Sequence, residues 1–300
     1  MKLDIAADVR DALNAGIPVI AMETTVITHG MGWPDNLEVT RDMQAAIRAT
    51  GAVPAVLAVV DGQVTVGLND EQLEHFARSD DDSTAKCSRR DLPGVVGLGR
   101  SGSLTVSATA LVAHAAGIEM FATGGIGGVH RGHPFDVSTD LTELARTPVA
   151  GVCAGAKSIL DLELTLEVLE THGVPVVGVG TDTLPAFYAR SSDYSVPIVA
   201  RTSAEAAAIL RGWRELDAGN GLLFTVPVPE AAALSAADTE QVIERAVAEA
   251  DEQGIRGNAI TPWVLARVVE LTDGRSLTTN KALLVNNARV AAEIAVGAKP

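Results

Sequence analysis

The chain has 300 residues, 47% of them hydrophobic and 20% charged, which excludes a disordered tail and is long enough to bury a large core. Its formal charge of −15 at pH 7 disfavours nucleic acid and anionic membranes as partners, because both are densely negative. A small phosphorylated ligand is still compatible with this charge, since a few local donors suffice to bind one phosphate.

The cysteine content and the first twenty residues indicate the cellular compartment. Cys87 and Cys153 lie in different segments without a CxxC spacing, which favours a reducing environment and excludes a cysteine metal cluster. Residues 1–20 carry charges such as Asp4 and Asp11, so they lack the apolar core of a signal peptide. No window has the length and apolar bulk of a membrane span. We expect a soluble cytoplasmic protein.

Apolar runs rich in Val and Ile alternate with helical patterns along most of the chain. The predicted strands are Pro18–Met22, Pro54–Val60, Gln63–Gly67, Gly94–Leu98, Ile118–Thr123, Val149–Cys153, Val174–Val179, Val196–Ala200 and Gly221–Val226. The predicted helices between them are Leu37–Ala49, Asp70–Arg78, Thr105–Ala115, Ile159–His172 and Ala204–Leu216. Strands and helices that alternate in this way predict a mostly parallel sheet with helices on both faces.

Helical patterns alone follow from residue 238 onward. The predicted helices are Thr239–Glu252, Thr261–Leu271 and Leu277–Val296. Asn69 with Gln72, and Asp238 with Gln241, have the spacing of a capping box and predict two helix starts. Because no linker rich in Pro or Ser precedes the last helices, we expect one domain over residues 1–300. Its expected fold is a three-layer α/β/α sandwich with a mostly parallel central sheet and a helical C-terminal layer.

Two residues with useful chemistry follow predicted strands, at the edge where open α/β sheets bind ligands. Lys157 comes after the apolar run 152–156, and partial desolvation there favours the neutral amine, which is a nucleophile. The alternative is a lysine at a helix start that pairs with Asp161. Glu23 also follows a strand, and its carboxyl group can act as a proton donor or base. The alternative is a carboxylate that ties down the loop 28–32.

A third predicted strand ends in a glycine-rich stretch, Gly124–Gly132, that contains His130 and Arg131. Dense glycine lets the backbone approach a ligand closely, and the two side chains add donors for an anion. A mobile linker is also rich in glycine, but it does not normally carry His and Arg between a strand and a helix. We therefore expect a loop that binds a ligand.

An oxygen-rich segment follows this loop. Asp136, Ser138, Thr139 and Asp140 offer carboxylates suited to Mg²⁺ or Mn²⁺ and hydroxyls suited to phosphate. A plain helix cap would explain the same residue types. The segment is therefore a candidate for metal or phosphate binding, and no His or Cys spacing indicates zinc.

Two further patterns leave alternatives open. Gly97, Gly99 and Gly102 have the GxGxxG spacing of a dinucleotide fingerprint, but no acidic residue ends the next strand, and a tight glycine turn explains them as well. Asn280, Asn286 and Asn287 interrupt a helical pattern, so they either face the site or cap a break in the helix.

Taken together, the motifs resemble the pseudouridine-5′-phosphate glycosidase family over nearly the whole chain. The segments that carry the resemblance are 22–30 (METTVITHG), 86–92 (KCSRRDL), 124–132 (GGIGGVHRG), 153–161 (CAGAKSILD), 184–187 (LPAF) and 286–288 (NNA). Two features depart from the family pattern. Thr24 stands in place of a serine, and the segment from His130 to Asp136 is shorter.

The resemblance implies reversible cleavage of the carbon–carbon bond between C1′ of ribose 5-phosphate and C5 of uracil in pseudouridine 5′-phosphate. It implies that Lys157 attacks C1′ to give a ring-opened imine, that Glu23 transfers the protons, and that water releases ribose 5-phosphate. It also implies a divalent metal, commonly Mn²⁺, on Asp136 and a homotrimer of α/β/α subunits. The residues that it implies for substrate binding are Lys86, Val106, His130, Ser138, Thr139, Asp140 and Asn280.

Two functions from other classes remain as alternatives. A Rossmann-type NAD-dependent oxidoreductase would bind nicotinamide and would not need Lys157. A sugar-phosphate-binding protein without enzymatic activity would bind its ligand without turnover, but it has no use for a lysine at a strand end beside a carboxylate. We expect the partners to be pseudouridine 5′-phosphate, uracil and ribose 5-phosphate, with no nucleic acid and no membrane.

Overall fold

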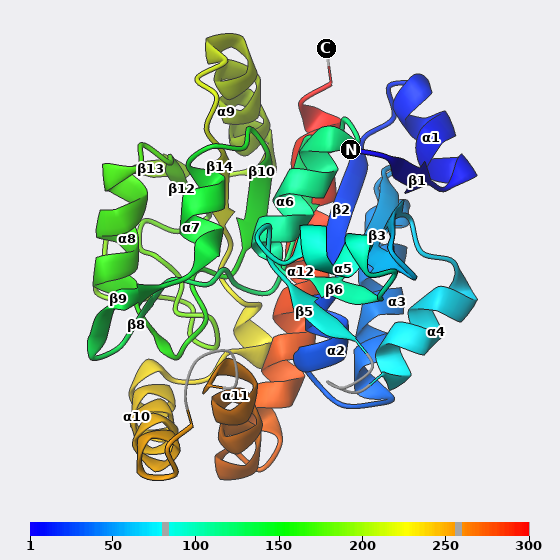
Figure 1. The fold of residues 1–300 in the computed structure, drawn as a ribbon. Coiled ribbons are helices and arrows are strands. Elements are labelled where there is room, and N and C mark those ends of the chain that lie inside the picture. Colours follow the sequence, from blue (N-terminus) through cyan, green and yellow to red (C-terminus); the bar gives the residue numbers. More distant parts are fainter. Residues whose placement is uncertain (80–83, 256–259, 300) are drawn as a thin grey trace.

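A computed structural model of the chain describes residues 1–79, 84–255 and 260–299. Its main sheet follows the path β1-β4-β3-β2-β7-β10-β14-β12-β13, with β5 and β6 attached beside β3 (Figure 1). The strands of this sheet are β1 (Leu3–Ile5), β2 (Val19–Glu23), β3 (Val53–Val60), β4 (Gln63–Val66), β5 (Ala85–Cys87), β6 (Gly102–Leu104), β7 (Met120–Ala122), β10 (Ala150–Cys153), β12 (Val176–Val179), β13 (Ile198–Ala200) and β14 (Leu222–Thr225).

Most neighbouring strands of the sheet are parallel, as predicted. β2 is parallel to β3 and β7, and β10 is parallel to β7 and β14. The central strands β2, β7, β10, β12 and β14 are buried along their whole length, because helices cover both of their faces. This burial explains why their sequences read as continuous apolar runs. The hairpin of β3 and β4 is antiparallel.

Helices cover both faces of the sheet and give the expected three layers. On one face α12 (Arg275–Gly297) packs against α3 (Asp35–Ala49) and α9 (Ser203–Leu216). On the other face α6 (Val106–Ala115) packs against α7 (Thr139–Leu144), and Figure 1 shows α6 in front of the sheet and α12 behind it. The remaining helices are α1 (Ala7–Asn14), α2 (Thr25–His29), α4 (Asp70–Arg78), α5 (Leu92–Gly97), α8 (Leu162–Thr171), the 3₁₀ helix η1 (Glu230–Ala232), α10 (Ala236–Glu252) and α11 (Ile260–Leu271).

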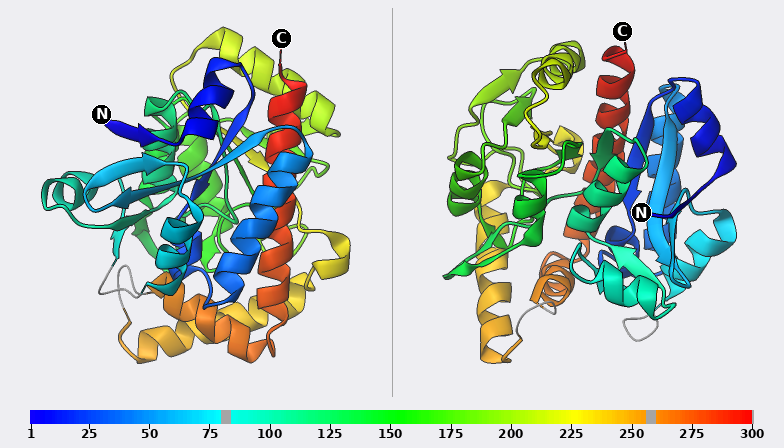
Figure 2. Two further views of the ribbon diagram at one scale, coloured as in Figure 1. Left: turned by 90° about the vertical axis from the view of Figure 1, so that its right-hand side faces the viewer. Right: turned by 45° about the horizontal axis from the view of Figure 1, so that its top comes forward.

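The C-terminal helices form the predicted helical layer and lie near the carboxyl ends of the strands. α10 and α11 pack against each other below the end of β2, where the chain enters α2 (Figures 1 and 2). α12 then runs back along the sheet and contacts β2, β7 and β10. None of the helices in the described part of the chain combines the length and the apolar character that a membrane crossing requires.

A second, three-stranded sheet was not predicted. It has the order β11-β8-β9 and is antiparallel, with β8 at Val129–His130, β9 at His133–Val137 and β11 at Leu160–Asp161. Strands of two to five residues that include charged and polar side chains leave no periodic signal in a sequence. The consequence is that the glycine-rich stretch ends in a strand of this small sheet, at Val129–His130.

Two predictions of local structure were wrong, and a third was confirmed. Gly94–Leu98 is not a strand, because the short helix α5 begins at Leu92, with Pro93 in its first turn, and takes up most of this apolar run. The helix expected to start at Asp238 begins earlier, since the side chain of Ser235 caps α10 by accepting the N–H of Asp238. The capping box of Asn69 and Gln72 is confirmed at α4.

The GxGxxG pattern also lies in the wrong context for a dinucleotide site. Gly97 ends α5, Gly99 has a left-handed φ of 65°, and Gly102 begins the strand β6. A dinucleotide fingerprint needs a strand before the glycines and a helix directly after them, whereas here a helix precedes them and a strand follows. The glycine turn is therefore the correct interpretation, and the residues that suggested a Rossmann oxidoreductase do not form its phosphate loop.

Candidate active site

The carboxyl ends of three adjacent strands define the candidate site. In the sheet β7 lies between β2 and β10, so the segments that follow these three strands emerge at one edge. Glu23 is the last residue of β2, and Lys157 follows β10 by four residues. The glycine stretch after β7 joins the segment after β10, because the N–H of Lys157 donates to the carbonyl oxygen of Ile126 over 3.0 Å.

A cavity of about 240 Å³ opens at this edge. The predicted site residues that line it are Glu23, Lys86, His130, Asp136, Ser138, Thr139, Asp140 and Lys157. Residues separated by more than a hundred positions therefore meet in one place. Thr25, Thr105 and Thr261 also line the cavity and were not predicted, because an isolated threonine carries no distinctive signal.

Two of the predicted residues do not line this cavity. Val106 is buried as the first residue of α6, directly after Thr105, whose side chain caps that helix. Asn280 lies on α12 behind the glycine stretch, and its Oδ1 would be 3.6 Å from a Cβ atom added at Gly124. The cavity reaches a neighbour of Val106 but not Val106 itself.

Glu23 is a buried carboxyl group with charged neighbours. Burial raises the pKa of Glu23 above its ordinary value of 4.5, while the positive charges of Lys157 and Lys86 and a hydrogen bond from Thr123 act to lower that pKa. Burial is the largest of these effects, and the negative charge of Asp140 adds to it. Glu23 therefore keeps its proton at a higher pH than an exposed glutamate does, which suits a proton donor.

Two successive hydrogen bonds connect the carboxyl group of Glu23 to helix α12. The hydroxyl of Thr123 donates to Oε1 of Glu23, and the backbone carbonyl of Thr123 accepts a 2.9 Å hydrogen bond from Nδ2 of Asn287 on α12. All three side chains are buried. Asn287 therefore faces the ends of the strands from the helical layer. Of the two interpretations of this asparagine, a residue that faces the site and a cap of a helix break, the first is correct. Glu23 makes no hydrogen bond to the loop 28–32 in the described part of the chain.

The surroundings of Lys157 exclude its alternative role. In the described part of the chain Lys157 forms no ion pair with Asp161, whose carboxylate instead accepts the N–H of Leu164 over 2.9 Å and caps α8. For this reason α8 starts at Leu162 and not at Ile159, and Lys157 stays in the segment that lines the cavity.

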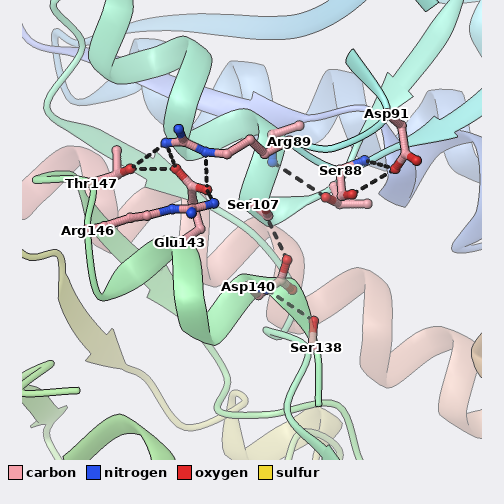
Figure 3. A network of polar contacts seen from close by, with 11 residues as sticks. Ser88, Arg89, Asp91, Ser107, Ser138, Asp140, Glu143, Arg146 and Thr147 are labelled. Carbon is pink, nitrogen blue, oxygen red and sulfur yellow. Dashed lines mark hydrogen bonds and ion pairs between the residues drawn. The ribbon is translucent and has the colours of Figure 1, made fainter. Parts of the chain in front are cut away.

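Asp140 and Ser138 hold the backbone around the cavity. The carboxylate of Asp140 accepts the N–H of Ser107 over 2.9 Å (Figure 3). It also accepts the N–H of Gly127 over 2.8 Å. Ser138 caps α7 by accepting the N–H of Asp140 over 3.2 Å. The helix cap that was an alternative for this segment is therefore present, and the same residues also line the cavity. A Cβ atom at Gly127 would lie 2.2 Å from Oγ of Ser138, so this close approach requires glycine.

A buried ion-pair network lies beside these residues and was not predicted. Glu143, one turn after Asp140 on α7, is fully buried and accepts a 2.7 Å hydrogen bond from Nε of Arg89 and a 3.0 Å bond from Nη2 of Arg146 (Figure 3). The network joins α7 to the segment that follows Lys86. A sequence gives no signal for it, because Arg89 and Glu143 are 54 positions apart.

His130 and Arg131 point to different places. His130 lines the cavity, and burial lowers its pKa below 6.5, so at neutral pH it is a neutral hydrogen-bond partner. The prediction that Arg131 donates to an anion in this cavity is corrected. Arg131 lines a separate cavity of about 710 Å³, and its guanidinium donates to two backbone carbonyls and to Glu240.

Asp136 is the candidate metal ligand. It lies on β9 with its residue exposed, and it lines the cavity together with His130 and Asp140. Among the described residues, no group of three or more His, Cys, Asp or Glu side chains could hold a metal ion. A hard divalent cation does not need such a cluster, however. It can bind through a single carboxylate together with several water molecules and the phosphate of a substrate. Asp136 fits that kind of site.

The two cysteines are buried and free. Burial raises the pKa of Cys153, at the end of β10, to about 12, and the pKa of Cys87 to about 11. Both thiols therefore stay protonated at neutral pH, and a thiolate nucleophile is excluded at these positions. Neither cysteine lines the cavity, whereas the amines of Lys157 and Lys86 do.

Known proteins match this chain almost from end to end. Pseudouridine-5′-phosphate glycosidases of Methylobacterium nodulans and Paracoccus denitrificans are 53% and 50% identical to it, over 98% and 97% of this chain and 87% and 96% of theirs. The solved structure of the prealnumycin C-glycosynthase AlnA in complex with ribulose 5-phosphate is 36% identical and has a TM-score of 0.90, with 99% of this chain and 97% of AlnA covered.

The match extends to a family and to a second solved structure. A solved indigoidine synthase A-like protein from Thermotoga maritima has a TM-score of 0.89 and 35% identity, and covers 99% of this chain and 96% of its own. The sequence profile of the family described as indigoidine synthase A like protein matches residues 8–297. These matches confirm the resemblance that the strand-end motifs carry, and the chain belongs to the indigoidine synthase A-like family.

Proposed function

We propose that the protein is a pseudouridine-5′-phosphate glycosidase, which reversibly cleaves the bond between C1′ of the ribose and C5 of uracil. The observation that carries the proposal is that Glu23 and Lys157 line one cavity at the ends of strands on either side of β7. The names of the relatives and the ribulose 5-phosphate bound by AlnA support a five-carbon sugar phosphate as ligand.

The bond that breaks joins two carbon atoms, and uracil must leave with the electron pair on C5, which makes it a poor leaving group. The neutral amine of Lys157 attacks C1′, the bond from C1′ to the ring oxygen breaks, and Glu23 gives its proton to that oxygen. Glu23, now a carboxylate, removes a proton from the attached nitrogen, and the freed lone pair forms the imine while the C1′–C5 bond breaks. Glu23 passes that proton to C5 of the departing uracil and later accepts one from the water that adds to the imine. Water adds to the imine, the carbon–nitrogen bond breaks, and ribose 5-phosphate leaves with Lys157 restored. Lys86 assists by its charge near the sugar phosphate.

Asp136 would hold the divalent metal, which we propose to be Mn²⁺. When bound, such a cation neutralises phosphate charge and orients the substrate. Ser138, Thr139 and Asp140 line the same wall and would contact the substrate, with His130 as a neutral partner. The proposal further includes a cytoplasmic homotrimer, which rests on the family resemblance.

The test follows free uracil released from pseudouridine 5′-phosphate in the presence of Mn²⁺, with borohydride added in a parallel reaction. Borohydride reduces the imine carbon–nitrogen double bond to a stable amine, which tethers the sugar phosphate to the attacking lysine. We expect mass spectrometry of the digest to find the adduct on Lys157. Lys157→Arg keeps a positive charge without the nucleophile and should be inactive.

Three results would contradict parts of the proposal. Binding of the substrate without release of uracil would favour the sugar-phosphate-binding alternative. An adduct on Lys86 would reassign the nucleophile, and so would substantial turnover by Lys157→Arg, while both would leave the substrate assignment intact.

A further inference from the structure

We propose that Arg131 is a positioning residue that fixes the turn carrying Lys157. The inference rests on the proposed function, because it concerns the lysine that attacks the substrate. It assigns to Arg131 a task different from anion binding, on the side of the turn that faces away from the reacting cavity.

The guanidinium of Arg131 holds two carbonyl oxygens of one short turn. Nε donates to the carbonyl of Leu160 over 3.2 Å, and Nη2 donates to the carbonyl of Ser158 over 3.2 Å. The turn itself closes through a 3.0 Å hydrogen bond from the N–H of Leu160 to the carbonyl of Lys157. Both acceptors of Arg131 therefore belong to the four residues that begin with the nucleophile.

The other side of the turn is anchored by the glycine stretch. The N–H of Lys157 donates to the carbonyl of Ile126, and Leu160 pairs with His130 between the antiparallel strands β11 and β8. His130 lines the reacting cavity, while the next residue, Arg131, lines the larger cavity. Leu160 lines both cavities, so the turn is the wall between them and Arg131 supports that wall from outside.

Arginine suits this task better than lysine does. Its planar fork presents several N–H donors at fixed angles and can bind two carbonyl oxygens at once, whereas a lysine ammonium cannot reproduce that geometry. The Arg131 side chain is only 27% exposed, but its third partner, Glu240 on α10, is 49% exposed. The pair is bidentate, with Nη1 donating to Oε1 and Nη2 to Oε2 of Glu240, but it ties Arg131 to α10 and not to the turn. The two carbonyl bonds are the contacts that reach the turn itself, and a Glu240 variant separates the two contributions.

Loss of these two hydrogen bonds should affect the rate at which Lys157 attacks C1′ more than the affinity for the sugar phosphate. Lys157 must meet C1′ at bonding distance and angle, and a displacement of about 1 Å can cost about 100-fold in rate. Ligand contacts from Asp136, Ser138 and Thr139 come from a different segment of the chain. Loss of Arg131 should therefore slow bond formation at Lys157 while the sugar phosphate still binds.

The experiment measures bond formation, binding and local structure separately. Ribose 5-phosphate is trapped on Lys157 with borohydride, its affinity is measured by calorimetry, and hydrogen exchange of the peptide spanning residues 157–160 reports on the turn. In Arg131→Met and Arg131→Lys we expect trapping to fall about 10- to 100-fold, affinity to change less than about threefold, and exchange of this peptide to accelerate. The lysine variant should lose less than the methionine variant.

Two matched controls separate the carbonyl bonds from other contacts. Ser158→Ala removes a buried hydroxyl without a hydrogen-bond partner in the described residues and leaves the backbone carbonyl in place, so trapping should stay at the wild-type rate. Glu240→Gln removes the charge of the exposed partner and should reduce trapping by less than about threefold.

The inference is overturned if both folded Arg131 variants trap ribose 5-phosphate at the wild-type rate, or if exchange of residues 157–160 is unchanged. It is also overturned if affinity and melting temperature fall in parallel with trapping, since that pattern indicates a general structural role. A wild-type protein that forms no adduct on Lys157 would contradict the proposed chemistry instead, and the exchange measurement would still decide whether Arg131 holds the turn.

Discussion

At the scale of single residues, Glu23 and Lys157 owe their chemistry to where two strands end. Glu23 occupies the last position of a strand that is buried throughout, so desolvation acts on its carboxyl group. The charge of Lys157 acts on the same carboxyl group and opposes desolvation. The balance favours a protonated Glu23 near the lysine, which is the pairing that acid-assisted attack by an amine needs.

We expect Glu23→Gln to lower kcat by about 10²- to 10⁴-fold, because glutamine keeps the shape of the side chain but has no proton to transfer. The affinity for ribose 5-phosphate, measured by calorimetry, should change little. A variant with nearly normal kcat and weakened binding would show instead that Glu23 is only a ligand of the substrate.

The pH dependence of kcat is a second test of Glu23 as the proton donor. The pKa of Glu23 is raised, so its acid form persists above pH 4.5, and activity that needs this form is lost as pH rises through the raised value. Thr123→Val removes a donor that lowers the pKa of Glu23 and should move this loss to higher pH, with nearly the same side-chain volume. If the pH profile of kcat is the same in Thr123→Val and wild type, Glu23 does not cause the loss of activity at high pH.

At the scale of elements, the short helix α7 connects the walls of the cavity through two buried carboxylates. Asp140 holds the start of α6 and the glycine stretch by backbone N–H groups, and Glu143 holds Arg89 after β5. A six-residue helix is not stable alone, so these tertiary contacts maintain it.

Glu143→Gln should destabilise the protein at pH 7 by about 1–3 kcal/mol, since it removes a charged acceptor while Arg89 and Arg146 can turn towards water. The Arg89 guanidinium and the other donors hold the pKa of Glu143 below its ordinary value of 4.5. This stability is therefore present above pH 4.5 and is lost as pH falls through the lowered pKa.

Urea unfolding at pH 7 and at low pH measures this contribution. The difference between wild type and Glu143→Gln should shrink as the pH falls below 4.5. Arg146→Met, which removes only the more exposed of the two arginines, serves as control and should have a smaller effect at pH 7. An equal difference at both pH values would contradict an ionic origin.

The elements also show what a sequence predicts and what it does not. Strands such as Val19–Glu23 and helices such as Asp70–Arg78 follow from apolar periodicity and capping, and the strand ends located Glu23 and Lys157. The apolar run around Val95 was ambiguous, because a single turn of helix and a short strand have the same pattern. The direction of Arg131 depends on the pairing of β8 with β11 and on its contact with Leu160, 29 positions away, which leaves no local signal.

At the scale of the whole molecule, three distant parts of the chain build one cavity. Glu23 comes from the first strands, Lys157 from the middle of the chain, and Thr261 from α11 in the C-terminal layer. The helical layer is therefore part of the site as well as part of the core. α12 contributes again through Asn287, which reaches the end of β7.

The net charge of −15 opposes the binding of a substrate with an anionic phosphate, so local cations must offset it. Lys86 supplies a positive charge in the cavity, since Lys157 must be neutral to attack, and the cavity also contains the carboxylates of Asp136 and Asp140. A divalent cation at Asp136 would add positive charge to the cavity and so favour the binding of the phosphate. We therefore expect chelation to abolish the release of uracil and added Mn²⁺ to restore it. Asp136→Ala should need far more Mn²⁺, whereas Asp193→Ala, a carboxylate beside the larger cavity, should not. Full activity of the chelated enzyme would refute the metal requirement.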